Sequence, residues 1–163
     1  MSDRTYTRFT IPMSVLADAV LAEVVRCAFD LTTPEFQQII LAEPAPDEAA
    51  GVEGTTVRLV GGRPCLVFED PDGNYGGSYI QSELIDSAVP FVQHNGSGHE
   101  YGPASTAFLP GETEIIRLDR DLNPIAGIRL DGERALVDRD ELADLERYGR
   151  LRRRILLYPA VTT

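Results

Sequence analysis

The sequence predicts an α+β domain, in which a mostly antiparallel β-sheet is packed by three to four α-helices. Two observations predict this class: short β-branched runs joined by turn dipeptides, and stretches with apolar residues at helical spacing. The chain has 163 residues, 43% hydrophobic and 25% charged, which is the size and composition of one globular domain. We therefore expect residues 1–163 to form a single domain.

The first elements are a strand and a helix. Residues 4–12 (RTYTRFTIP) alternate roughly between polar and apolar side chains and end at a proline, which is typical of a strand. From Ser14 to Val25 the apolar residues recur at helical spacing, and Ser14 is placed to cap this helix.

A second helix and a loop follow. In residues 31–44 (LTTPEFQQIILAEP), Thr33 is expected to cap the helix, because Pro34 fits a first turn, where a missing N–H costs nothing. Residues 43–54 (EPAPDEAAGVEG) are acidic and lack periodicity, which predicts an exposed loop.

The middle of the chain predicts a hairpin, a helix and a strand. Residues 55–60 and 65–69 are apolar or β-branched runs joined through a Gly-Gly pair, which tolerates the positive φ of a tight hairpin. Residues 78–87 show helical spacing, and residues 89–93 return as a strand.

The last third predicts a meander and a final helix. Turn dipeptides separate the four expected strands, which are residues 105–111, 113–121, 125–130 and 133–137. Residues 138–150 then predict a helix, because Asp138 and Glu141 have the spacing of a capping box.

An arginine-rich segment, residues 147–158 (RYGRLRRRILLY), lies near the end of the chain. Its arginines could grip RNA or an acidic partner. Alternatively they cover the protein's own acidic surface, or alternate with apolar residues along a closing strand. We favour the last two alternatives, because the apolar residues of the segment need a core to enter.

The charge restricts the possible partners. The net charge is −11, from 26 acidic and 15 basic residues, and every basic residue is an arginine. Residues 147–163 hold five arginines and no acid, so the rest of the chain carries −16. An acidic surface repels phosphate backbones, which argues against direct nucleic-acid binding except through this segment. It can instead occupy the basic groove of a nucleic-acid-binding protein, or serve solubility alone.

The sequence also predicts where the protein resides. No apolar run reaches the roughly 18 residues of a membrane span, and the start MSDRTYTRFT lacks the pattern of a secretion signal. We therefore expect a cytoplasmic protein without a membrane partner. Cys27 and Cys65 each lie in an apolar stretch, which predicts small buried side chains rather than a disulfide or metal ligands.

Residues 69–85 (EDPDGNYGGSYIQSELI) look like a calcium loop. Counting from Asp72 places Glu83 at the twelfth position of an EF-hand loop, but the fifth is Gly76, which offers no side-chain oxygen. If the count starts at the preceding aspartate, the twelfth position no longer holds the glutamate that would bind calcium through both oxygens. An EF-hand also needs an entering helix, whereas a strand is expected here, so we interpret the segment as a strand-to-helix turn.

A second polar cluster contains His94 and His99, the chain's two histidines, with Glu100 beside the latter. Two imidazoles and a carboxylate could hold zinc or perform acid–base chemistry. Their spacing does not place them on one face of a helix or strand, and a third ligand is not obvious. We therefore expect no metal and no cofactor. The sequence also lacks a G-x-S-x-G, phosphate-loop or cysteine–histidine signature, so we propose no catalytic residue.

The run NYGGSYIQSELI, followed by VPFVQHNGSGHEYGPASTAFLPGE, resembles small proteins of unknown function carried by phages and plasmids. The shared features are an Asn-Tyr-Gly step, a helix, a proline-aromatic strand, a Gly–Glu-Tyr turn and an aromatic strand ending in Pro-Gly, over roughly residues 65–118. The resemblance implies an accessory protein of a mobile element, and the anti-CRISPR and anti-restriction inhibitors are the best-known functional class of that kind.

We therefore expect a non-catalytic interaction protein that inhibits a basic nucleic-acid-handling partner, such as the CRISPR effector that the resemblance implies. Acidic residues on exposed loops should meet arginines or lysines of that partner; they are Asp47, Glu48, Glu53, Asp70 and Asp72. One alternative is a small metal-dependent enzyme or metal-binding protein using His94, His99 and Glu100. Another is an antitoxin-like neutralising protein. An exposed strand edge would also permit a homodimer.

Overall fold

The computed structural model describes residues 4–44, 50–52, 54–74, 77–97 and 102–159. Within them, the strands are β1 (Arg4–Pro12), β2 (Ala50–Val52), β3 (Thr55–Val60), β4 (Arg63–Asn74), β5 (Phe91–Asn95), β6 (Ala104–Leu109), β7 (Glu112–Arg117), β8 (Ile128–Asp131) and β9 (Arg134–Val137). The helices are η1 (Met13–Ala17), a 3-10 turn, and α1 (Ala19–Ala28), α2 (Thr33–Ile40), α3 (Ser78–Asp86) and α4 (Arg139–Leu156).

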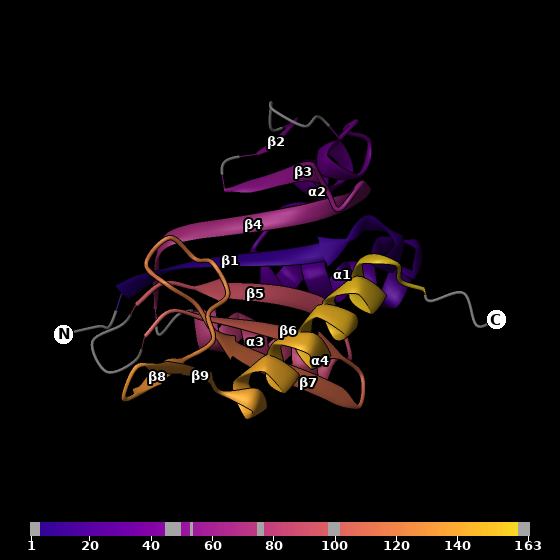
Figure 1. The fold of residues 1–163 in the computed structure, drawn as a ribbon. Coiled ribbons are helices and arrows are strands. Elements are labelled where there is room, and N and C mark those ends of the chain that lie inside the picture. Colours follow the sequence, from indigo (N-terminus) through magenta and orange to yellow (C-terminus); the bar gives the residue numbers. More distant parts are fainter. Residues whose placement is uncertain (1–3, 45–49, 53, 75–76, 98–101, 160–163) are drawn as a thin grey trace.

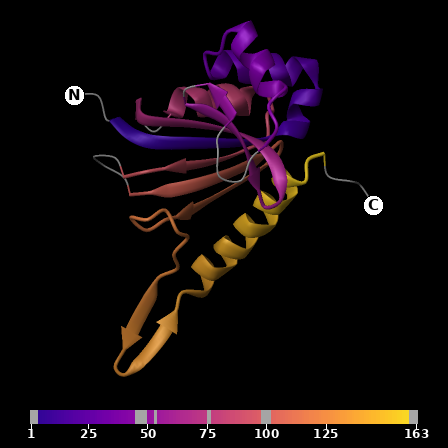
Figure 2. The ribbon, with the colours of Figure 1, turned by 90° about the horizontal axis from the view of Figure 1, so that it is seen from above.

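Strands β1 to β7 form one antiparallel sheet in the order β2-β3-β4-β1-β5-β6-β7, and β8 and β9 form a separate hairpin. Helices α1, α2 and α3 cover one face of the sheet, and α4 crosses the other (Figures 1 and 2). The predicted α+β class with a mostly antiparallel sheet is confirmed. Among the described residues, no helix is long and apolar enough to cross a membrane.

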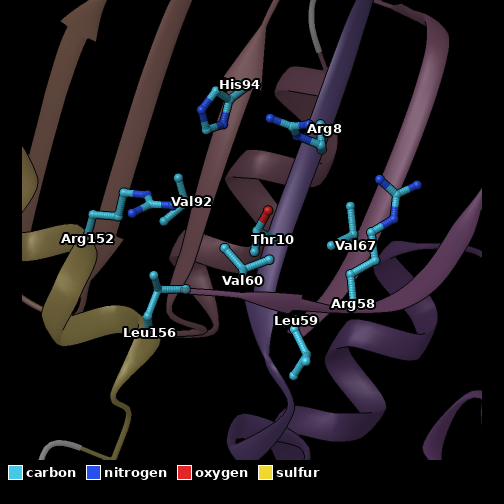
Figure 3. Close-up of a pocket in the computed structure, with 10 residues that line it drawn as sticks. All are labelled: Arg8, Thr10, Arg58, Leu59, Val60, Val67, Val92, His94, Arg152 and Leu156. Atoms are coloured by element: carbon cyan, nitrogen blue, oxygen red, sulfur yellow. The ribbon is translucent and has the colours of Figure 1, made fainter. Parts of the chain in front are cut away.

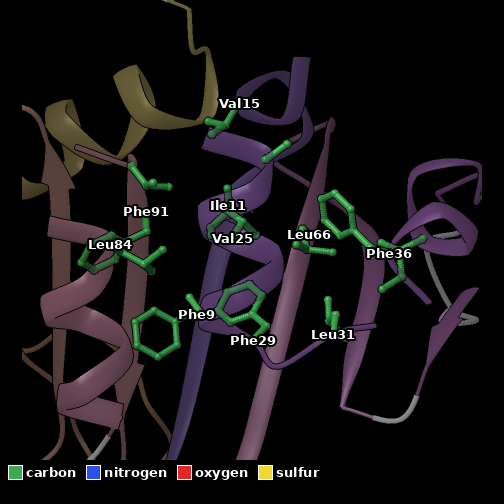
Figure 4. Close-up of a cluster of buried hydrophobic side chains, with 14 of the residues drawn as sticks. Phe9, Ile11, Val15, Val25, Phe29, Leu31, Phe36, Leu66, Leu84 and Phe91 are labelled. Carbon is green, nitrogen blue, oxygen red and sulfur yellow. The ribbon is translucent and has the colours of Figure 1, made fainter. Parts of the chain in front are cut away.

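The central strand β1 divides its side chains between the two faces, because successive residues of a strand point to opposite sides. Phe9 and Ile11 are fully buried under α1, α2 and α3. The ring of Phe9 packs against the rings of Phe91 and Phe29, with 5.7 Å and 6.1 Å between the ring centroids. These rings belong to the main core shown in Figure 4. Arg8 therefore points to the opposite face, the one that α4 crosses.

Helix α4 closes a second, smaller core. Tyr148, Leu151 and Ile155 recur at helical spacing and are buried against Val92 and Ile116 of the sheet. These contacts lie on β5, β6 and β7, so α4 covers only that half of the sheet face that it crosses. The other half of this face, formed by β1, β3 and β4, has no helix over it (Figure 2).

The arginine-rich segment is the final part of α4, so the closing-strand alternative is wrong. The buried residues of this segment fall three to four apart, which suits a helix rather than a strand. Arg147 pairs with Glu114, at 3.4 Å between Nε and Oε1, and Arg154 pairs with Glu112. These two arginines therefore cover acidic residues of the protein itself, which was the other alternative favoured from the sequence.

The structure corrects the caps predicted for the first two helices. Asp18, not Ser14, caps α1, because its carboxylate accepts hydrogen bonds from the first free N–H groups, while the preceding residues form the η1 turn. Thr32, not Thr33, caps α2, and it forms a reciprocal capping box with Glu35. The capping residue follows the predicted one in α1 and precedes it in α2.

At the start of α4 the predicted cap is confirmed, but the predicted capping box is wrong. Asp138 accepts hydrogen bonds from the N–H groups of Asp140 and Glu141. The Glu141 carboxylate turns away and accepts from Gly127 N and from Arg117 instead. It thus ties α4 to the segment that precedes the hairpin.

The predicted four-strand meander is also wrong, because β7 does not continue into β8 through sheet pairing. Strand β7 ends at Arg117, and the Asp119 carboxylate then accepts hydrogen bonds from the N–H groups of Asp121 and Asn123, at 2.9 and 2.8 Å. This turn directs the chain out of the sheet, and the β8–β9 hairpin projects from the body (Figure 2).

Two local predictions also change. The expected loop at residues 43–54 contains β2, a short edge strand paired with β3. Cys65 is buried, as predicted, and burial raises the pKa of its thiol to about 11. Cys27 is exposed on α1, so the expectation that it is buried is wrong.

Candidate functional site

The face that α4 leaves partly uncovered contains a hollow of about 270 Å³. We call it the basic hollow, because its polar lining consists of Arg8, Thr10, Arg58, His94 and Arg152 (Figure 3). It is the candidate site of this protein, since it gathers polar groups from four elements that are far apart in the sequence.

Strand register brings these side chains together. Arg8 on β1 is opposite His94 on β5, and the next residue of β1 on this face, Thr10, lies one step further along. Arg58 belongs to β3, two strands away, and reaches Glu69 on the intervening strand β4. Arg152 comes from α4, and Figure 3 shows it and Arg8 on either side of His94.

The arginines outnumber the carboxylates that could neutralise them. Glu69 is shared by Arg8, at 3.9 Å between Nη1 and Oε1, and by Arg58, at 3.4 Å between Nη2 and Oε2. The Tyr6 hydroxyl donates to the same carboxylate at 3.0 Å. Arg152 forms no hydrogen bond or ion pair within the part of the chain that the structure describes. A chain of net charge −11 thus carries a locally positive site.

His94 is the polar group of the hollow with the least satisfied environment. Its Nδ1 atom is buried and has no hydrogen-bond partner among the described residues. The pKa of His94 is lowered to about 4, first by desolvation and then by the nearby charges of Arg8 and Arg152. The imidazole is therefore neutral at neutral pH, with one nitrogen a donor and the other an acceptor.

The rest of the lining is apolar. The apolar lining residues are Val60, Val67 and Val92, whose side chains point into the hollow, with Leu156 of α4 and Leu59 of β3. The basic hollow thus has a charged part and an apolar part, which is the usual composition of a small-molecule site.

None of the predicted partner-binding acids is among the described residues that line this site. Asp47, Glu48 and Glu53 are outside the described residues. Asp70 and Asp72 belong to β4, where Asp70 is half-buried opposite Thr7 and its parity places it on the other face of the sheet. The five residues therefore remain a predicted surface rather than an observed one.

The predicted histidine cluster is described only in part. His99 and Glu100 are outside the described residues, whereas His94 lies in the basic hollow. Two arginines beside an imidazole repel a cation, so the surroundings of His94 do not favour a metal ion. Among the described residues, no group of three histidines, cysteines or carboxylates could hold a metal.

The calcium-loop alternative also lacks its structural frame. Strand β4 runs to Asn74, so a strand precedes the segment where an EF-hand requires a helix. Gly77 then caps α3 with a φ of 71°. A Cβ atom there would lie 2.9 Å from Phe9 Cε2, so this glycine serves close packing between the α3 cap and β1.

Sequence reasoning missed Arg8 and Arg58 of the basic hollow, and it considered Arg152 only as part of the arginine-rich segment. A signal was present for Arg8, because alternate positions of the first strand are polar and can line one face. Nothing in the sequence shows that this strand is central in the sheet, or that the arginine-rich segment passes over it. Searches against protein-family models, curated proteins and solved structures found no match to this chain.

Proposed function

We propose that this protein is a non-catalytic binding protein that takes the anionic group of a ligand into the basic hollow. One observation carries the proposal: in an acidic protein, Arg8, Arg58 and Arg152 line one hollow whose described lining contains no carboxylate, and Glu69 beside it pairs with two of them. A guanidinium group presents a planar fork of N–H donors that matches a carboxylate or phosphate, which makes an oxyanion the natural ligand.

The unliganded site is electrostatically unfavourable. Like charges near each other repel, and the repulsion grows where the sheet and α4 exclude water. A buried polar atom without a hydrogen bond costs roughly 1–3 kcal/mol, which applies to His94 Nδ1. A bound oxyanion would neutralise the arginines and accept a hydrogen bond from the imidazole, so binding would relieve both costs.

The lining favours binding over catalysis. Among the described lining residues there is no carboxylate or thiol, and Thr10 supplies the one hydroxyl. A general base works best with a pKa near the operating pH, and the pKa of His94, about 4, lies well below neutrality. The groups of the hollow are thus suited to hold an anion.

The proposal is tested by isothermal titration calorimetry of the purified protein with small oxyanions, at low and high salt. Arg152→Gln should abolish the binding, because it removes the arginine that has no hydrogen-bond or ion-pair partner among the described residues. Arg153→Gln is the matched control, since it changes the same charge at an exposed position of the same helix. Equal binding by the two variants would refute the proposal.

A second candidate function is the one expected from charge: the acidic surface binds a basic partner, which the resemblance implies is a nucleic-acid-handling protein such as a CRISPR effector. The projecting hairpin favours it, because every described side chain from Leu130 to Asp140 is exposed. This stretch includes the acidic residues Asp131, Glu133, Asp138 and Asp140.

The second candidate is tested by pull-down from host lysate at low and high salt. A basic partner that is released at high salt would support it. Charge reversal of Asp47, Glu48, Glu53, Asp70 and Asp72 should then slow association, most at low salt. Unchanged association at low salt would show that the acidity serves solubility alone. An antitoxin-like role would differ only in the identity of the protein that co-purifies.

A further inference from the structure

We infer that the ligand of the basic hollow is a small amphiphilic carboxylate, with its carboxylate beside Arg152 and His94 and a short apolar body on Val92 and Val60. This inference rests on the proposed function and adds the chemical class of the ligand. It comes from the order in which polar and apolar side chains follow one another across the site.

The sheet presents a polar row and then an apolar row. In the first row, Arg8 is flanked by its Cα partner Glu69 on β4 and its partner His94 on β5. In the next row on the same face, Thr10 is flanked by Val67 and Val92. Rows two residues apart are separated by about 6.6–6.8 Å along the strands. A ligand that uses both rows therefore needs a charged end and an apolar end separated by that length.

Helix α4 repeats the same order. Arg152 and Leu156 are four residues apart, so they lie one above the other on the same face of the helix. Figure 3 shows Arg152 at the His94 end of the hollow and Leu156 at the Val60 end. Since the sheet and the helix become apolar in the same direction, the hollow has one charged end and one apolar end.

The charged end favours a head group of one negative charge. Arg8 and Arg58 already share Glu69, and Arg58 also donates from Nε to Thr56 Oγ1 at 3.1 Å. Arg152 is the arginine of the hollow without a carboxylate of its own. A carboxylate accepts a forked pair of hydrogen bonds from one guanidinium and still has lone pairs for the imidazole of His94.

The size of the hollow sets the length of the body. Its volume of about 270 Å³ is near the lower limit of ligand pockets, which span roughly 300–1,000 Å³. A bare oxyanion would leave the apolar end unused, while a body of about five carbons would reach from one row to the next.

The inference is tested by calorimetry of the full chain with acetate, butanoate, hexanoate and decanoate at constant ionic strength and neutral pH. Affinity should rise roughly two- to fourfold for each added methylene up to hexanoate, because each methylene leaves water. It should then stop rising at decanoate, whose chain exceeds the apolar row. Equal affinities for acetate and hexanoate would overturn the inference.

Two variants separate this inference from the proposed function. Val60→Thr keeps the shape of the apolar end but replaces a methyl group with a hydroxyl, so it should reduce the gain in affinity from acetate to hexanoate. Arg152→Gln should abolish binding of every member of the series. If acetate binds and depends on Arg152 without any gain from chain length, the proposed function stands and the amphiphile is wrong. If no anion binds to the folded protein, both are wrong.

Hexyl phosphate tests the head group. Hexyl phosphate has six carbons, as hexanoate does, but its phosphate places up to two negative charges near Arg152. We expect hexanoate to bind at least as tightly as hexyl phosphate. Binding of hexyl phosphate more than about tenfold tighter would overturn the assignment of a carboxylate head. Thermal unfolding of each variant, compared with wild type, confirms that the measured losses come from the site.

Discussion

Arg8 and His94 are Cα partners on the adjacent strands β1 and β5, and both side chains enter the basic hollow from the same face of the sheet. The pairing places a permanent positive charge beside a titratable imidazole. After desolvation, the charge of Arg8 is the next cause that lowers the pKa of His94. The pKa of His94 should therefore rise when a negative charge neutralises Arg8.

The stability of the free protein should fall as the pH decreases from about 6.5 to about 4. The pKa of His94 is lowered from 6.5 to about 4 in the folded protein, so over this range the unfolded state binds more protons and acidification favours unfolding. The loss assigned to this group is about 1–3 kcal/mol. It is measured as the difference between wild type and His94→Gln in urea unfolding at several pH values. Parallel pH profiles for the two proteins would contradict this origin.

Glu69→Gln should strengthen anion binding severalfold. Glu69 is the carboxylate shared by Arg8 and Arg58, and its neutralisation leaves two further guanidinium groups without a negative partner. These ion pairs are about one-third exposed, so their loss should cost stability little, about 1 kcal/mol or less. Calorimetry with acetate measures the effect. Weaker binding would instead show that Glu69 holds the arginines in position.

Gly77→Ala should destabilise the protein by about 2–4 kcal/mol. Gly77 has a φ of 71°, and an added Cβ would lie 2.9 Å from the ring of Phe9. Gly111→Ala is the control, because its φ of 87° is equally unfavourable for alanine but nothing lies within 4 Å of the added atom. Equilibrium unfolding compares the two. A loss no larger than that of Gly111→Ala would mean that the contact with Phe9 is unimportant.

Gly149→Ala should stabilise the protein by about 0.5–1 kcal/mol. Gly149 is exposed in the interior of α4, and nothing lies within 4 Å of an added Cβ. Alanine restricts the unfolded chain and favours the helix. Thermal unfolding measures the gain, and a destabilised variant would contradict a continuous helix through the arginine-rich segment.

Elements that depend on local patterns were predictable from the sequence. The hairpin of β3 and β4 follows from two β-branched runs around Gly61 and Gly62, both of which have positive φ in the structure. Helix α3 likewise follows from its periodicity. In these segments the turn chemistry and the apolar spacing agree, so no tertiary contact is needed to decide between a helix and a strand.

Features that depend on distant contacts were not predictable. The Asp119 side chain ends the sheet at β7, yet an aspartate in a polar run gives no sign that it will bond to the N–H groups of Asp121 and Asn123. The arginine-rich segment is helical because its apolar residues meet β5, β6 and β7, whose order depends on the whole sheet.

The candidate site shows the same limit. Arg8, Arg58 and Arg152 lie near the start, in the middle and near the end of the chain, and the strand order together with the packing of α4 on the sheet brings them to one hollow. The sequence singled out His94, but grouped it with His99 and Glu100 because they are close along the chain. In the structure its neighbours are arginines, so the ligand that its surroundings favour is an anion, whereas the alternative from the sequence was a metal ion.

The decisive measurement is the pKa of His94. It is obtained from the ¹⁵N signals of the imidazole ring in NMR spectra recorded across a range of pH values, without ligand and with saturating hexanoate or phosphate. His94→Gln assigns the signal. We predict a pKa of about 4 in the free protein and a clear increase with a bound anion, together with a shift of the Nδ1 resonance, because the anion offsets Arg8 and Arg152. If neither anion changes the pKa or the ring signals of His94, the result contradicts anion binding in the basic hollow.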